Sequence, residues 1–145
     1  MQTTKTKSGR NTLLIAVAVI VVAVIVGAVF AANMYLLHPV VNTPLVNQTV
    51  SVAPGTTQKF TFNVPAGATN ARVTGTFSTA GGSGNDIIVY ITNNGTTIYN
   101  STQVSATNFA INLNPGQTYS MVFDNTFSTV SVKDVSAQAT LTYNK

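Results

Sequence analysis

An apolar run without a single polar side chain, residues 13–32, constrains this chain more than any other feature. A helix rises about 1.5 Å per residue, so these 20 residues span about 30 Å, the thickness of the hydrocarbon core of a bilayer. In lipid each backbone N–H must be paired within its own segment, which makes an isolated span helical even when Val and Ile dominate it. We therefore predict a single transmembrane α-helix over residues 13–32, with the lipid bilayer as a partner.

Basic residues lie almost entirely on one side of this run. Lys5, Lys7 and Arg10 precede it, and the next basic residue is Lys59. The positive-inside bias predicts that residues 1–12 form a short basic cytoplasmic tail of a single-pass cell-membrane protein whose C-terminal domain is extracytoplasmic. The formal net charge of +4 is thus mainly a topology signal, and no nucleic-acid partner is predicted.

Two alternatives remain open for this N-terminal region. Residues 29–31 (Val-Phe-Ala) offer a weak small-x-small cleavage pattern, and cleavage there would produce a secreted binding module. Archaeal pilins also join an apolar N-terminal helix to a Thr/Asn-rich sandwich in surface filaments, but residues 7–12 (Lys-Ser-Gly-Arg-Asn-Thr) depart from their processing site. The mature N-terminus separates the three cases: Met1 for the anchor, Arg10 for a pilin and Ala32 for a secreted module.

From residue 46 onward, apolar and polar side chains alternate with a period of two. Residues 33–45, with Pro39 and Pro44, are expected to be a tether, and turn-forming Gly, Pro and Asn residues separate the alternating stretches that follow. Asn94-Gly95 is the strongest hairpin signal. We predict that residues 46–145 form an all-β, jelly-roll-like antiparallel β-sandwich of about eight strands.

Composition excludes most catalytic chemistry. The chain has no Cys, three acidic residues, all Asp, and a single histidine, His38. Thiol catalysis, disulfides and cysteine zinc sites are excluded, and a Ser nucleophile would lack a base, because His38 falls at the predicted membrane interface. Asp86 and Asp124 together would supply too few oxygens for calcium. We expect no enzyme activity, no metal and no cofactor.

Three N-x-S/T sequons begin at Asn47, Asn94 and Asn100. They lie in or near turns of the predicted outer domain, so they predict an N-glycoprotein. The alternative interpretation is that Asn and Thr simply form turns and strands here. Charged residues are only 7% of the chain, which makes glycans one source of solubility for a surface of Thr, Ser, Asn and Gln.

Two stretches near the C-terminus resemble a known family. Residues 119–128 (Tyr-Ser-Met-Val-Phe-Asp-Asn-Thr-Phe-Ser) and 133–143 (Lys-Asp-Val-Ser-Ala-Gln-Ala-Thr-Leu-Thr-Tyr) resemble the final strands of Golgi-dynamics (GOLD) domains. Residues 60–65 and 85–90 fit earlier strands of that family. A second family, the sandwich that follows secreted peptidases, is similar in its middle strands but lacks the F-D-N-T segment. The GOLD resemblance covers about residues 46–145 and implies a β-sandwich that binds proteins or lipids without catalysis.

The F-D-N-T segment is the most distinctive candidate site. Asp124, Asn125, Thr126 and Phe127 follow a strand directly, so the Asp side chain can accept a backbone N–H in a structural Asx turn, or the segment can be a recognition loop. Together these features predict a membrane-anchored extracytoplasmic binding module of a prokaryotic, archaeal-like cell envelope. Its expected partners are other membrane or envelope proteins, in a homo- or hetero-oligomer or as an accessory subunit of a larger complex.

Overall fold

The computed structural model describes residues 8–82 and 84–145 and divides into two units, Met1–Pro39 and Val40–Lys145. The first unit contains α1 (Ser8–Leu37), in which side chains are described for Val17 and residues 19–33. Counted over the described residues, the chain has no helix that is long and apolar enough to cross a membrane. Lys5 and Lys7 lie outside the described residues, as does the side chain of Arg10. The anchor over residues 13–32 stays a prediction.

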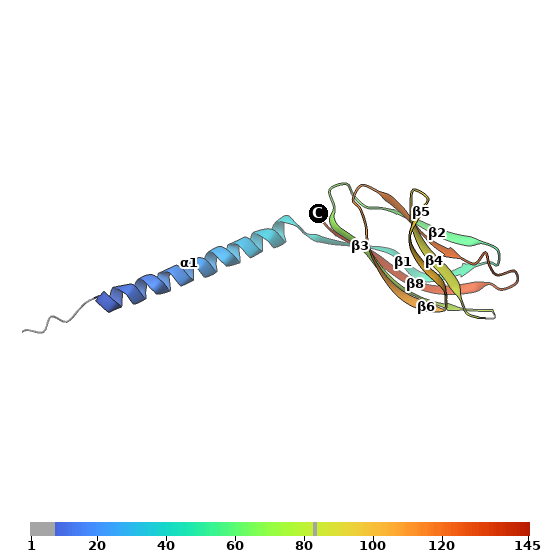
Figure 1. The fold of residues 1–145 in the computed structure, drawn as a ribbon, viewed down its shortest axis with the longest axis horizontal. Helices are drawn as coiled ribbons and strands as arrows, with labels where there is room; N and C mark the ends of the chain where they lie inside the picture. Colours follow the sequence, from blue (N-terminus) through green and yellow to red (C-terminus); the bar gives the residue numbers. More distant parts are fainter. Residues whose placement is uncertain (1–7, 83) are drawn as a thin grey trace, which may run out of the picture. The chain divides into compact units, whose positions relative to one another are not determined.

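The second unit consists of two four-stranded antiparallel sheets (Figure 1). One sheet has the order β1-β8-β3-β6 and the other β2-β7-β4-β5, which is the strand order of a jelly roll. The predicted all-β antiparallel sandwich of eight strands is therefore confirmed. The strands are β1 (Val40–Val52), β2 (Thr57–Asn63), β3 (Thr69–Ala80), β4 (Ile87–Asn93), β5 (Thr96–Val104), β6 (Ala106–Asn112), β7 (Thr118–Asp124) and β8 (Lys133–Asn144).

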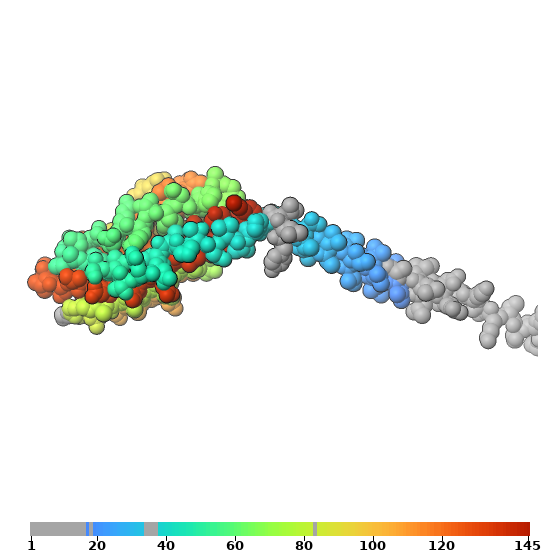
Figure 2. All heavy atoms as spheres, turned by 180° about the vertical axis from the view of Figure 1, so that it is seen from behind, coloured from blue at the N-terminus to red at the C-terminus, as the bar shows by residue number. Residues whose placement is uncertain are grey.

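The first strand begins earlier than predicted. β1 starts at Val40, inside the range 33–45 assigned to a tether, and pairs with β8 from Val40–Asn144 to Val52–Lys133. Figure 2 shows this strand in teal beside the red C-terminal strand. Pro44 misled the sequence analysis because proline usually interrupts a sheet, but β1 is an edge strand and its register shifts between Pro44 and Val46. Proline is tolerated at such bulges.

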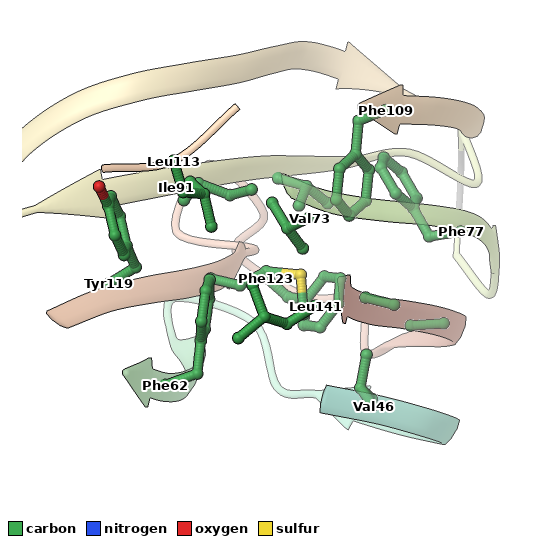
Figure 3. Packing of buried hydrophobic residues seen from close by; sticks show 14 of the residues in the cluster. Val46, Phe62, Val73, Phe77, Ile91, Phe109, Leu113, Tyr119, Phe123 and Leu141 are labelled. Carbon is green, nitrogen blue, oxygen red and sulfur yellow. The ribbon is translucent and has the colours of Figure 1, made fainter. Parts of the chain in front are cut away.

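The core fills the space between the two sheets (Figure 3). Phe123 on β7 lies at its centre, with the Phe60 ring 5.8 Å and the Phe77 ring 6.4 Å from it, both edge-on. The predicted alternation explains why these side chains reach the core, because every second residue of a strand faces the same side of a sheet. Labelled members from both sheets are Val46, Phe62, Val73, Phe77, Ile91, Phe109, Leu113, Tyr119, Phe123 and Leu141.

The Asn94-Gly95 hairpin is present as predicted. It joins β4 to β5 through two residues, both with positive φ (48° and 83°). A two-residue loop of this kind matches the right-handed twist of the flanking strands. β4 and β5 therefore lie side by side at one edge of their sheet.

Phe123 and Phe127 are expected to contribute very differently to stability. The Phe123 side chain is 1% exposed in the core, whereas Phe127 follows the turn and is 37% exposed. Phe123→Ala should lower the free energy of unfolding by about 3–5 kcal/mol, and Phe127→Ala by less than about 1 kcal/mol. Urea denaturation of both variants measures this. Equal losses would contradict the packing described above.

Candidate functional site

The outer face of the sheet β2-β7-β4-β5 carries a shallow, open hollow of about 600 Å³. All four strands contribute to it, together with the hairpin between β4 and β5. The lining residues are Thr57, Lys59, Ile88, Tyr90, Thr92, Gly95, Thr97, Asn100, Val122 and Asp124. We refer to this surface as the Tyr90 face.

Strand register explains why these side chains meet. Val122 is the cross-strand partner of both Lys59 and Tyr90, so the three form one row across β2, β7 and β4. Asn100 on β5 extends this row beyond Tyr90. Asp124 lies in the next row, opposite Ile88. Directly opposed side chains on a sheet are close enough to act as one surface.

The Tyr90 face has an apolar centre and charged flanks. Val122 is only 6% exposed although it points away from the core, while Ile88 and Tyr90 are half-buried around it. Burial raises the pKa of the Tyr90 phenol, and the negative charge of Asp124 raises that pKa further. Tyr90 is therefore protonated at neutral pH and can donate a hydrogen bond. A few convergent polar groups around an apolar floor are typical of a binding surface.

The F-D-N-T segment begins at the edge of this face. Asp124 Oδ1 accepts a hydrogen bond from the Thr126 N–H at 2.8 Å, the geometry of an Asx turn. Thr126 and Phe127 are exposed beyond it. Asp124 thus lines the hollow and also shapes the turn, so the structural and the recognition interpretations of this residue do not compete.

Asn125 is fully buried and ties two loops together. Its side-chain amide donates to the Val52 carbonyl at 3.1 Å and to the Ser131 carbonyl at 2.8 Å. Its backbone N–H donates to the Thr56 carbonyl at 3.0 Å, and its own carbonyl accepts from Gly55 at 3.1 Å. Asn125 therefore fixes the β1–β2 turn against the loop between β7 and β8.

Lys133 and Asp86 form an ion pair that the sequence analysis missed. Lys133 is 1% exposed, and its Nζ lies 3.0 Å from Asp86 Oδ1, while Gln103 donates to the other carboxylate oxygen. The hydrogen bond from Gln103, followed by that from Lys133, lowers the pKa of Asp86. The sequence did indicate that Lys133 is buried, because Lys133 is in phase with the core residues Val135 and Ala137 of the same strand.

Asp86 and Asp124 hold separate sets of hydrogen bonds, and the part of the chain described here contains no cluster of three metal-ligating residues.

The three sequon asparagines are all exposed. Asn47 lies in β1, Asn94 at the tip of the β4–β5 hairpin, and Asn100 on β5 opposite Tyr90. Asn100 Oδ1 accepts a hydrogen bond from the Thr102 N–H at 2.7 Å. Glycosylation at each of the three stays a prediction.

Comparison with known proteins gives one family. A family model described as emp24/gp25L/p24 family/GOLD matches residues 48–144. No curated protein matches the chain. Among solved structures, the native structure of a family 35 carbohydrate binding module from Clostridium thermocellum is similar, with a TM-score of 0.35 and 12% sequence identity over 72% of this chain and 90% of that one. A similarity at this level says nothing about the ligand of this chain.

Asp86 should make stability depend on acid pH. Its pKa is lowered in the folded state, so its contribution is complete above the unfolded pKa of about 3.9 and disappears as the pH falls through the folded value. The melting temperature of the wild type should therefore decrease as the pH is lowered through this range. Lys133→Met removes the buried partner charge, so in the double variant Asp86→Asn with Lys133→Met that part of the fall should be absent. An unchanged profile in the double variant would contradict the pairing.

Asn125 should matter more for stability than Asp124. Asn125→Ala leaves two carbonyls without their buried donor and should cost about 2–4 kcal/mol. Asp124→Ala removes one acceptor in an exposed turn and should cost about 1 kcal/mol, while Asp124→Asn keeps an acceptor and should cost less. Thermal melts of the three variants give this order. A larger loss for Asp124→Ala than for Asn125→Ala would contradict it.

Proposed function

Since the chain belongs to the emp24/gp25L/p24 family of GOLD domains, we propose that it is a membrane-anchored binding module that holds its partner on the Tyr90 face. Members of this family are binding modules without enzymatic activity, acting in a membrane context. The Tyr90 face is the observation that carries the proposal for this chain. It is the place where half-buried apolar side chains, an aromatic hydroxyl and both signs of charge meet on one sheet.

The chemistry of this face favours a protein partner. Tyr is enriched at protein interfaces because its ring buries apolar area while its hydroxyl still hydrogen-bonds. Lys59 and Asp124 lie on two sides of the apolar centre, and among the described residues Lys59 has no ion-pair partner. A partner can therefore bring one acidic and one basic or amide group to fixed positions around an apolar contact, which gives specificity.

The anchor is supported by the character of α1. Each large apolar side chain described in this helix, ten in all from Val17 to Phe30, is between 50% and 68% exposed. A helix that is apolar on all sides requires an apolar environment. Residues 13–32 in a bilayer supply it, with Lys5, Lys7 and Arg10 on the cytoplasmic side and the sandwich outside the cell. The partner is then another protein of the cell envelope, and the chain acts as an accessory subunit.

Site-specific photocrosslinking tests the Tyr90 face. A benzophenone side chain at Thr92, which lines the hollow, should give a crosslinked product in intact membranes. The matched control is Thr140 on β8, equally half-buried but on the outer face of the opposite sheet, and it should give none. Tyr90→Ala should reduce the product at Thr92 about tenfold, the loss typical of removing an interface aromatic. Equal products at both positions, or no effect of Tyr90→Ala, would contradict the proposal.

Protease accessibility tests the topology. Protease added to intact cells should remove the sandwich and leave the segment around residues 13–32 in the membrane. A sandwich that is cleaved only after the cells are lysed would place it on the cytoplasmic side. Determining the mature N-terminus on the same sample identifies an unprocessed anchor by Met1.

A further inference from the structure

The pairing of β4 with β5 contains a bulge beside the Tyr90 face. Two residues of β5, Ser101 and Thr102, fill the place opposite the single residue Val89 of β4. Thr102 has a φ of 59°, a left-handed conformation that is uncommon for a β-branched residue. Bulges and strained residues are frequent at functional sites, where they change the direction in which a neighbouring side chain points.

Side-chain hydrogen bonds hold this bulge and orient Asn100. The Val89 N–H donates to Ser101 Oγ at 2.8 Å, and the Thr102 N–H donates to Asn100 Oδ1 at 2.7 Å. A backbone N–H can bond only to the oxygen of a carboxamide, so the second contact fixes which end of the Asn100 amide faces the bulge. The other end, Nδ2, is the donor that Asn100 has left for the Tyr90 face.

Asn100, Tyr90 and Asp124 form one polar group on this face. Asn100 lies directly opposite Tyr90 on β5. Asp124 lies on β7, two residues beyond Val122, which is the cross-strand partner of Tyr90. The β-carbons of opposed residues are about 5 Å apart, and a diagonal neighbour is still within reach of an aromatic side chain. All three side chains line the same hollow.

This polar group offers two hydrogen-bond donors and one acceptor. Burial and the charge of Asp124 raise the pKa of the Tyr90 phenol, so its hydroxyl keeps its proton at neutral pH. Among the residues that the structure describes, neither the Tyr90 hydroxyl nor Asn100 Nδ2 has a hydrogen-bond partner. Asp124 uses only Oδ1 there, for the Thr126 N–H, which leaves Oδ2 as an acceptor.

The combination of donors and acceptor discriminates between partner groups. A carboxylate has acceptors only and would lie beside the negative charge of Asp124. An ammonium or guanidinium group has donors only, and would leave the Tyr90 and Asn100 donors without an acceptor. A primary amide has a carbonyl oxygen and an NH₂ group side by side, so it satisfies both kinds of atom.

We propose, as a refinement that rests on the function proposed above, that Tyr90, Asn100 and Asp124 bind the side-chain carboxamide of an Asn or Gln residue of the protein partner. Tyr90 Oη and Asn100 Nδ2 donate to its oxygen, and its NH₂ group donates to Asp124 Oδ2. The apolar stem of that side chain packs on Val122. A group that lacks either the oxygen or the NH₂ leaves part of the site unpaired, which makes the site selective.

Asn100→Asp tests the donor without disturbing the bulge, because it keeps the oxygen that accepts the Thr102 N–H. The product of the benzophenone crosslinker at Thr92 should fall about tenfold, with an unchanged melting temperature. Asn108→Asp makes the same change of charge on the outer face of the opposite sheet and should leave the product unchanged.

Asp124→Asn separates an amide from a cation as the bound group. The variant keeps a neutral acceptor, so for a partner amide the product should fall less than about threefold at low and at high salt. For a partner ammonium or guanidinium group the loss should be about tenfold at low salt and smaller at high salt, and this result would overturn the proposal.

Thr102→Gly tests whether Asn100 is unmodified, as the proposal requires of this sequon residue. The variant removes the sequon, and glycine tolerates the φ of 59°, so the crosslinked product and the electrophoretic mobility should be unchanged and the melting temperature should not fall. A glycan on Asn100 of the wild type would occupy Nδ2 and overturn the proposal.

Mass spectrometry of the wild-type product identifies the partner residue. It should place an Asn or Gln of the partner beside the crosslinked position, and its exchange for Asp or Glu should reduce the product about tenfold. A site without such a residue, or a full product with Asn100→Asp, overturns the carboxamide. The Tyr90 face itself then stands as long as Tyr90→Ala still reduces the product, whereas a wild type that gives no product at Thr92 overturns both.

Discussion

The register of β7 between β2 and β4 determines both the core and the candidate binding surface. In this register Tyr119, Met121 and Phe123 face the opposite sheet, while Val122 and Asp124 face outward beside Lys59, Ile88 and Tyr90. A shift by one residue would exchange the two sets. The cost of exposing Phe123 therefore also keeps Val122 and Asp124 in place. The side chains of the Tyr90 face are therefore held in position by the packing of the core.

Polar side-chain contacts hold the loops at one end of the sandwich in place. Asn125 joins the β1–β2 turn to the loop after β7, and Lys133 joins the start of β8 to Asp86 before β4. Burying an N–H donor or an ammonium group is costly unless it is hydrogen-bonded, so the bonds from Asn125 Nδ2 and Lys133 Nζ hold the loops in one arrangement. Because Asp124 directly precedes Asn125, the loop end holds Asp124 where it lines the Tyr90 face. The order of the loops and the geometry of the Tyr90 face are therefore linked through two adjacent residues, Asp124 and Asn125.

Sequence periodicity predicted the sandwich, its strands and the Asn94-Gly95 hairpin, because these depend on local patterns. It did not predict β1 from Val40, since the partner that accommodates Pro44 is β8, about a hundred residues away. The Tyr90 face was missed for the same reason: Lys59, Tyr90 and Val122 share a row only through long-range strand pairing. Alternation tells which side of a sheet a residue faces, but not which residues are beside it. Asp124 was singled out because its turn is local.

Because the chain has few charged residues, its edge strands have few charges that would prevent pairing with another chain. Of the charged residues within the strands, only Lys59 lies on an edge strand, and Lys133 is already committed to Asp86 inside the sandwich. Two other edge strands are interrupted by backbone geometry instead, β1 by the bulge at Pro44 and β5 by its irregular register against β4. An edge that lacks both charge and irregularity must satisfy its backbone groups with water or with another strand.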